Sequence, residues 1–214
     1  MNIKWLGHAT FLITSDNGIR IITDPYTPNE RLTYSEIKES ADIVTVSHGH
    51  GDHNNVAAIG GSPAVVEETV EVKGIKISGI PVYHDDVGGG QRGSNTIFCF
   101  EVDGIRLCHL GDLGHPLSDE QVTQLGRVDV LMIPVGGYFT IDAGVATGVC
   151  DKLAPRLIIP MHYKNERCPG FPVAGVDDFI KGKSNVTNLE VSEMEVKAGV
   201  LPATAQIVVM KPAL

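Results

Sequence analysis

The chain has no run of Lys and Arg residues. Its 214 residues include 17 basic and 26 acidic side chains, which gives a formal net charge of −9. Proteins that bind long nucleic acids use clustered Lys and Arg, because contacts to phosphates dominate that binding. The charge balance therefore disfavours a nuclease that acts on long RNA or DNA.

Long apolar stretches are also absent. No segment approaches the roughly 20 apolar residues that a helix needs to span a bilayer. The first residues, Met1 to Trp5, begin a predicted strand at once and do not have the layout of a signal peptide. We therefore expect a cytoplasmic protein that makes no contact with membranes.

Cysteine is scarce, and the chain has no Cys-x-x-Cys pair among Cys99, Cys108, Cys150 and Cys168. In a cytoplasmic chain such cysteines are expected to be reduced thiols that are mostly buried. Cys168 follows His162 in a Pro/Gly-rich stretch. Two interpretations of it stay open, an ordinary loop cysteine and a residue near a functional site.

Hydrophobic periodicity predicts hairpins first and alternating helices and strands later. Strands are expected over residues 3–6, 10–13, 19–23, 43–46, 64–66, 71–82, 95–102, 105–110, 128–135, 156–161 and 205–210. Helices are expected over residues 34–40 and 54–59, from Ser118 to 125, from Thr140 or Asp142 to 153, and over 176–181. Since no Pro/Ser-rich linker interrupts this order, we expect one domain over residues 1–214. The order indicates the α/β class, with two packed sheets and helices on their outer faces.

The most informative segment is residues 47–53, with the sequence Ser-His-Gly-His-Gly-Asp-His, directly after a predicted buried strand. Three imidazoles and one carboxylate fall within six consecutive positions. Both kinds of side chain suit divalent transition metals such as zinc, iron or manganese. The two glycines allow the loop to fold back and to direct several side chains inward. The segment therefore predicts a metal site.

This motif resembles the signature of the metallo-β-lactamase superfamily, and further landmarks of that family follow in the expected order. Asp24 closes an early strand, and His84, Asp112 and His162 each follow a later strand. The resemblance implies a four-layer αββα sandwich, the metallo-β-lactamase fold, with metals between the sheets at one edge. The opening segment 5–11 is similar to the small branch that includes ascorbate-phosphate lactonases and metal-dependent hydrolase-like proteins.

The resemblance also implies how the ligands divide between two divalent metal ions, for which zinc is expected and manganese or iron are alternatives. The implied ligands are His48, His50 and His84 for the first ion, Asp52, His53 and His162 for the second, and Asp112 for both. A hydroxide held between two such ions is a nucleophile at neutral pH. Asp52 is in addition a candidate catalytic residue that orients this nucleophile or moves its proton. Asp24 is expected to accept a hydrogen bond from a ligating histidine, with a plain turn role before Pro25 as the alternative.

Other side chains are candidates for catalysis or substrate binding. His8 and His115 are candidate catalytic residues that contact or protonate the leaving group, with a structural role as the alternative for each. His109 is expected to pack in the core or behind the site. The candidate substrate-binding residues are Arg92 and Asn95, in a Gly-rich loop after His84, and Tyr138 and Thr140, before a helix N-terminus.

These patterns favour a dinuclear metal-dependent hydrolase that uses a metal-bridging hydroxide. Its substrate is expected to be a small anionic molecule with an ester, lactone or phosphodiester bond. Two alternatives stay open: a non-hydrolytic di-iron redox or sensor protein, and a nuclease that acts on short oligonucleotides or cyclic dinucleotides. A homo-oligomer is compatible with the sequence.

Overall fold

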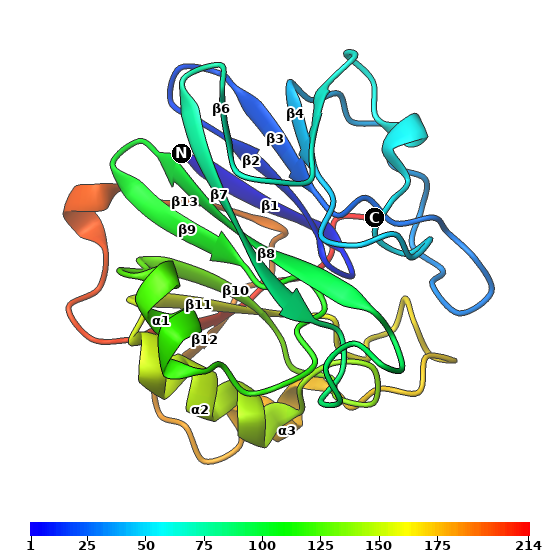
Figure 1. The fold of residues 1–214 in the computed structure, drawn as a ribbon, viewed down its shortest axis with the longest axis vertical. Helices are drawn as coiled ribbons and strands as arrows, with labels where there is room; N and C mark the ends of the chain where they lie inside the picture. The colour runs from blue at the N-terminus through cyan, green and yellow to red at the C-terminus, as the bar shows by residue number, and fades with distance from the viewer.

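Two β-sheets pack face to face in the computed structural model, which describes residues 1–214 (Figure 1). The smaller sheet has six strands in the order β13 (Glu193–Glu195), β1 (Asn2–Gly7), β2 (Thr10–Thr14), β3 (Arg20–Thr23), β4 (Ile43–Thr45) and β5 (Ala64–Val66). The larger sheet has eight strands in the order β12 (Val186–Asn188), β14 (Gln206–Val209), β11 (Leu157–Met161), β10 (Val130–Pro134), β9 (Ile105–His109), β8 (Ser94–Val102), β7 (Ile75–Tyr83) and β6 (Val70–Val72). Each sheet combines antiparallel hairpins with a parallel section. The α/β class that the sequence predicts is confirmed.

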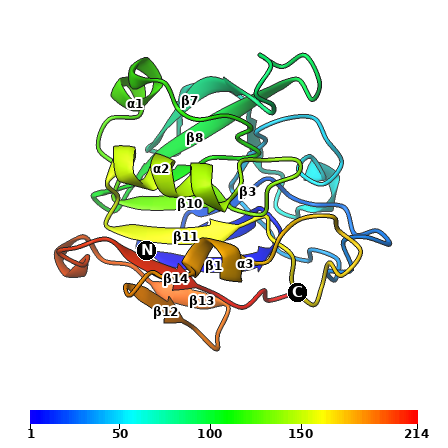
Figure 2. The ribbon, with the colours of Figure 1, turned by 90° about the horizontal axis from the view of Figure 1, so that it is seen from below.

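Three α-helices cover the outer face of the eight-stranded sheet, as Figure 2 shows. They are α1 (Asp119–Leu125), α2 (Ala143–Leu153) and α3 (Val176–Ile180), and two short 3₁₀ turns, η1 (Val56–Ala58) and η2 (Ala198–Val200), lie elsewhere. Ser118 caps α1, because its hydroxyl accepts from the Gln121 N–H while the Gln121 side chain accepts from the Ser118 N–H. Asp142, and not Thr140, caps α2 by accepting from the Val145 N–H at 2.9 Å. No helix of the chain combines the length and apolar character that a bilayer span requires.

The main core lies between the inner faces of the two sheets. Trp5 and Phe11 from the smaller sheet and Phe98 and Phe100 from the larger one are fully buried in the same cluster. Burial of aromatic side chains of this size contributes strongly to the hydrophobic stabilisation of a domain. This shared core fixes the position of the two sheets relative to each other, and hence of the loops at their edges.

The outer face of the six-stranded sheet is covered by irregular chain, and the helix expected over residues 34–40 is wrong. Residues 34–39 form neither a helix nor a strand, and the Glu39 carbonyl accepts from the Gly60 N–H at 3.1 Å. Just before them, Leu32 and Tyr34 are buried while Thr33 is exposed, which is the alternation of an extended segment. The Thr33 N–H donates to the Arg167 carbonyl at 2.7 Å, so this segment satisfies its backbone through another loop. The helix expected over residues 54–59 shortens in the same way to the single turn η1.

The strand expected over residues 71–82 is a hairpin. Lys73 and Gly74 both have left-handed φ values, 53° and 77°, and they form the two-residue turn between β6 and β7. Strands β12 and β13 are absent from the sequence prediction, because both are three residues long and lack a buried face. The remaining predicted strands form, with boundaries that differ by a few residues.

Two of the four cysteines contradict the prediction of reduced thiols. Cys99 and Cys108 form a disulfide. They are directly opposite each other in the antiparallel register of β8 and β9, with 4.1 Å between their Cα atoms, and this pairing is not visible in their spacing along the chain. Cys150 and Cys168 are free and buried, as expected.

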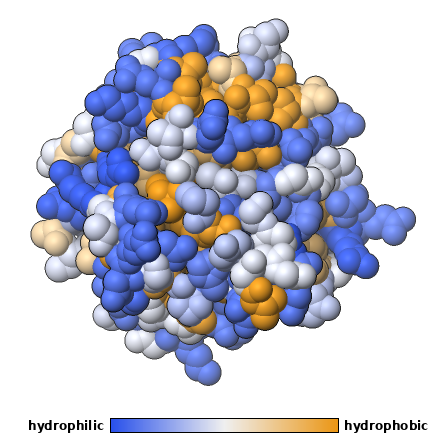
Figure 3. All heavy atoms as spheres, in the orientation of Figure 1, coloured by the Kyte–Doolittle hydropathy of each residue, from blue (hydrophilic) through white to orange (hydrophobic).

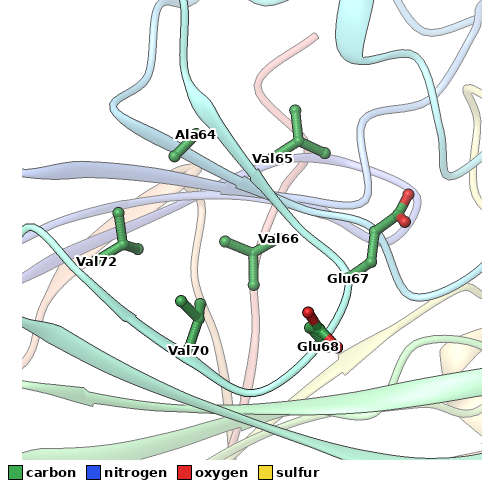
Figure 4. A pocket seen from close by; sticks show the side chains of 7 residues that line it. All are labelled: Ala64, Val65, Val66, Glu67, Glu68, Val70 and Val72. Atoms are coloured by element: carbon green, nitrogen blue, oxygen red, sulfur yellow. The ribbon is translucent and has the colours of Figure 1, made fainter.

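A shallow apolar groove lies where the chain crosses from β5 to β6, the edge strands of the two sheets. Figure 4 shows the valine side chains that line it and two glutamates at one end. Val65 and Val70 are exposed, and Figure 3 shows apolar atoms on the upper part of the surface in this orientation. The lining contains no histidine and no cysteine, so the groove lacks the ligands of the predicted metal site.

Candidate metal centre

The predicted site residues meet at one edge of the two-sheet core. His48 follows β4, His84 follows β7, Asp112 follows β9 and His162 follows β11. Parallel strands present their carboxyl ends at the same edge of a sheet, and ligand sites of α/β proteins lie there. Residues that are far apart in the sequence therefore converge in space.

Asp112 lies at the centre of this cluster. One of its oxygens, Oδ2, is 3.2 Å from His84 Nε2, 3.3 Å from His162 Nε2 and 3.9 Å from His48 Nε2. The other oxygen, Oδ1, is 3.2 Å from His53 Nε2. Only 2% of the Asp112 side chain is exposed, so these contacts lie away from bulk water. The carboxylate is thus placed between four histidines from three different parts of the chain.

The potential ligand atoms of the expected residues fall into two adjacent groups, and Asp24 forms a third group with His48 and His53. His48, His50 and His84 form one group, and within it the ligand atoms lie within 4.8 Å of one another. The second group contains Asp52, His53 and His162, and it also contains His8 at the same spacing. The structure therefore brings together all seven residues of the ligand set implied by the resemblance, and it adds His8 beside one of the two groups.

Asp24 lies behind both groups and is completely buried. Its Oδ1 accepts from the Ser47 N–H at 2.8 Å, and its Oδ2 accepts from the Ser47 hydroxyl at 2.5 Å and from His53 Nδ1 at 2.9 Å. Because the Ser47 hydroxyl gives its proton to Asp24, it accepts from His48 Nδ1, at 2.9 Å. In the neutral form of His48 and of His53 the proton thus lies on Nδ1, and Nε2 is the atom that can act as an acceptor or a ligand.

Several buried polar atoms of the cluster have no hydrogen-bond partner. They are His48 Nε2, His53 Nε2, His84 Nδ1, Asp112 Oδ1 and both ring nitrogens of His162. Buried polar atoms without a partner are rare in folded proteins. Imidazole nitrogen and carboxylate oxygen are ligands of zinc and of neighbouring divalent transition metals. The residues present therefore fit metal ions of this kind.

The charges of the cluster follow from burial and from the short distances. Burial lowers the pKa of His48 to about 3, and the charge of His53 acts in the same direction. Burial would raise the pKa of Asp112, but His162 and His53 hold it well below its usual range. Burial would lower the pKa of His53, but Asp112 and Asp24 together hold it well above its usual range.

A cavity of about 240 Å³ opens onto the cluster. It is lined by the polar side chains of His50, Asp52, His84 and Asp112 together with Arg92, Phe139 and Phe171. The Arg92 guanidinium carbon lies 5.7 Å from the centre of the Phe139 ring, and Arg92 Nη2 donates to the Tyr138 carbonyl at 3.1 Å. Arg92 is the one basic side chain among the lining residues.

The Gly-rich loop that carries Arg92 is held together by hydrogen bonds from its backbone N–H groups to Asp85. The Asp85 carboxylate accepts from the N–H groups of four loop residues at 2.7–3.0 Å, namely Val87, Gly89, Gln91 and Arg92. These N–H groups therefore point at Asp85 and are not available to an external anion. The result is a loop held in one shape, with the Arg92 side chain at the cavity.

Three of the other predicted residues lie away from the cavity. Asn95 is buried and does not line the cavity. Its side chain donates to the Leu110 carbonyl at 2.9 Å and accepts from the Asp112 N–H at 3.0 Å, so it supports the turn that carries Asp112. Thr140 is buried and donates to the Ile141 carbonyl. Tyr138 is two-thirds exposed and does not line the cavity, but its carbonyl accepts from Arg92 and its ring packs against Phe139 at 4.7 Å between centres.

The remaining histidines are also bonded within the protein. His115 Nδ1 donates to the Pro116 carbonyl at 2.8 Å while Nε2 accepts from the Tyr83 N–H at 3.2 Å, and the residue does not line the cavity. His109 is fully buried, donates to the Ala9 carbonyl at 2.8 Å and lies behind the site, as expected. His8 is 2% exposed and does not line the cavity, but its Nε2 lies 3.3 Å from Asp52 Oδ2, which does.

Sequence reasoning missed four residues of this region. Phe139 and Phe171 line the cavity, Ser47 links His48 to Asp24, and Asp85 organises the loop of Arg92. The available signals were weak: an aromatic residue in each of two Gly-containing loops, and a polar residue directly beside His48 or His84. Only the folded chain shows which of these neighbours turn inward.

Comparison with known proteins gives consistent matches. A family model described as a beta-lactamase superfamily domain matches residues 2–162. A UPF0173 metal-dependent hydrolase from Archaeoglobus fulgidus is 30% identical, over 85% of this chain and 90% of the relative. The crystal structure of a candidate Zn-dependent hydrolase of the metallo-β-lactamase superfamily from Thermotoga maritima is 36% identical, with a TM-score of 0.80, over 98% of this chain and 97% of that one.

A more distant structure agrees in fold. A metallo hydrolase from Ignicoccus hospitalis superposes with a TM-score of 0.61 at 22% identity, over 99% of this chain and 95% of that one. With the match over residues 2–162 and the similarity over most of the Archaeoglobus and Thermotoga proteins, the chain belongs to the metallo-β-lactamase superfamily, as a member of its UPF0173 family of metal-dependent hydrolases.

Proposed function

We propose that this metal-dependent hydrolase is dinuclear and cleaves an ester, lactone or phosphodiester bond of a small anionic molecule. One observation carries this proposal. The Asp112 carboxylate lies within 3.9 Å of the Nε2 atoms of four histidines, and three of those Nε2 atoms have no hydrogen-bond partner. A carboxylate in this position is suited to bridge two metal ions.

The ligand atoms would divide as their grouping in space indicates. His48, His50 and His84 would hold the first ion, Asp52, His53 and His162 would hold the second, and Asp112 would contact both. Nitrogen and oxygen donors favour zinc, manganese or iron over softer metals. Zinc is the metal that we expect, and the description of the Thermotoga maritima relative as a candidate Zn-dependent hydrolase supports it.

When bound, two divalent ions supply an acidic water at neutral pH and a Lewis acid for an oxygen of the substrate. The protein contributes charge and orientation. Burial would raise the pKa of Asp52, but its hydrogen bond with His8 and the charge of His53 lower it, so the carboxylate is ionised. Asp52 lines the cavity, where an ionised carboxylate can orient an attacking water and accept its proton.

The other residues that line the cavity indicate the type of substrate that we propose. Arg92 presents a permanent positive charge, which pairs well with a carboxylate or a phosphate. Phe139 and Phe171 lie 5.2 Å apart between ring centres and provide an apolar surface. A cavity of about 240 Å³ suits a small molecule and not a long polymer. An anionic group and an adjacent apolar part are therefore the expected features of the substrate.

The first experiment is elemental analysis of freshly purified protein, combined with turnover of bis(p-nitrophenyl) phosphate and of a simple lactone. We expect close to two zinc ions per chain and turnover of at least one probe, with Asp112→Ala as the inactive control. Two irons with a visible absorption spectrum and no turnover would contradict the proposal and would favour a redox or sensor protein. Activity on short oligonucleotides alone, with a steep dependence on salt, would favour a nuclease.

A further inference from the structure

We propose that His8 is a positioning residue, which holds the Asp52 carboxylate by a hydrogen bond and thereby raises the metal affinity of the group formed by Asp52, His53 and His162. This inference rests on the proposed dinuclear site. It concerns one ligand group only, so it makes a different claim from the proposed reaction.

The backbone at His8 is in an unusual conformation that its surroundings maintain. Its φ is 53°, in the left-handed region that residues other than glycine rarely adopt. The His8 carbonyl accepts from the Trp5 indole N–H at 3.0 Å and from the His162 N–H at 3.3 Å. Strained residues of this kind cluster at functional sites, where the surrounding structure holds them in place. In this backbone conformation the His8 imidazole lies against His53 and His162.

The His8 ring is packed among residues of the site. Its centre lies 4.2 Å from that of His162, 5.1 Å from that of His53 and 5.5 Å from that of Phe171. Its Nε2 lies 3.3 Å from Asp52 Oδ2. The ring therefore touches two of the proposed ligands by packing and the third by a polar contact.

The polar contact defines the role of the ring. An ionised carboxylate can only accept hydrogen bonds, so His8 Nε2 must carry a proton and donate it to Asp52. A ring nitrogen that carries a proton has no lone pair for a metal. His8 therefore acts through Asp52 and is not itself a ligand at that atom. Asp52 needs such support, because Gly51 precedes it and a quarter of its side chain is exposed.

Two substitutions separate a hydrogen-bonding role from other roles. In His8→Gln the side-chain amide ends near the position of the imidazole Nε2, so it can donate to Asp52. In His8→Asn the amide is too short to reach Asp52, while asparagine tolerates the left-handed backbone better than most residues. His115→Gln is the matched control, because His115 bonds only to the backbone at Tyr83 and Pro116.

The measurement is the number and the affinity of the Co²⁺ and Zn²⁺ ions that bind to the metal-depleted full-length protein. Absorbance and competition with a chelator report the binding, and circular dichroism checks that each variant is folded. Loss of a partner that orients a ligand typically lowers metal affinity by about 10- to 100-fold. We expect a loss of that size at one of the two sites in His8→Asn, and near wild-type binding in His8→Gln and His115→Gln.

Two results would overturn the inference. If folded His8→Asn binds both ions as tightly as the wild type does, the hydrogen bond does not contribute to metal affinity. If His8→Gln loses the site as completely as His8→Asn does, His8 is a ligand or a purely steric element. Since turnover is not measured, a wild-type protein that binds both ions without hydrolysing any probe would count against the proposed reaction and not against the role of His8.

Discussion

The Asp24 carboxylate accepts a hydrogen bond from His53 Nδ1 at 2.9 Å, and neither side chain is exposed to solvent. The same carboxylate oxygen accepts from the Ser47 hydroxyl, which in turn is bonded to His48. One buried carboxylate thus orients one histidine of each proposed ligand group. A hydrogen bond of this kind fixes the tautomer of a metal-binding imidazole and increases its basicity.

Replacing Asp24 by Asn is expected to weaken both metal sites. The amide has a single acceptor oxygen for the bonds that two carboxylate oxygens now accept, and its NH₂ group would oppose a proton on His53 Nδ1. The expected loss of metal affinity is about 10- to 100-fold, measured by chelator competition. Asp42→Asn is the control, because it removes the charge that pairs with Lys73 while the amide oxygen can still accept from the Arg20 N–H. Unchanged affinity in a folded Asp24→Asn protein would contradict the orienting role.

Asp112→Ala tests the central carboxylate. Because Asp112 lies close to histidines of both groups, its loss is expected to reduce metal content at both sites and to abolish turnover. Elemental analysis and a turnover assay measure the two effects, with Asp119→Ala at the exposed start of α1 as the control. If the Asp112→Ala protein keeps both ions and full activity, the bridging assignment is wrong.

Removal of metal is expected to lower the thermal stability of the protein. A ligand present at 100 times its dissociation constant stabilises the folded state by about 2.7 kcal/mol, which corresponds to roughly 5–10 °C in Tm for a chain of this size. Thermal unfolding before and after treatment with a chelator measures the shift, and added Zn²⁺ should restore the original Tm. The Asp112→Ala protein should show no such shift. An equal shift in both proteins would mean that the chelator acts elsewhere.

Arg92→Gln tests the proposed preference for anionic substrates. Loss of one charge-assisted hydrogen bond is expected to raise KM for an anionic substrate by about tenfold, with a smaller change in kcat. Arg92→Lys keeps the charge but loses the paired donors, so an intermediate KM is expected. A neutral ester serves as the matched control. An equal rise in KM for the neutral and the anionic substrate would show that Arg92 only shapes the cavity.

Local patterns were sufficient for many elements of this protein. The Ser118 cap and the Asp142 cap depend on residues within four positions of each other, so both helices were predictable. The alternation of residues 32–34 was not enough to exclude a helix there, because the deciding hydrogen bond reaches Arg167 in a distant loop. The disulfide between Cys99 and Cys108 likewise depends on the register of two strands.

The sequence by itself determined the chemistry available to this protein. The spacing of His48, His50, Asp52 and His53 after a buried strand placed metal-binding side chains in one loop, and the family resemblance indicated the distant partners. Tertiary structure decided which of the other polar residues take part. It directed His8 to Asp52 and bonded His115 and Asn95 to the backbone. The physical reason is that a hydrogen bond depends on distance and direction in space, and the packing of two sheets, which no short segment encodes, sets both.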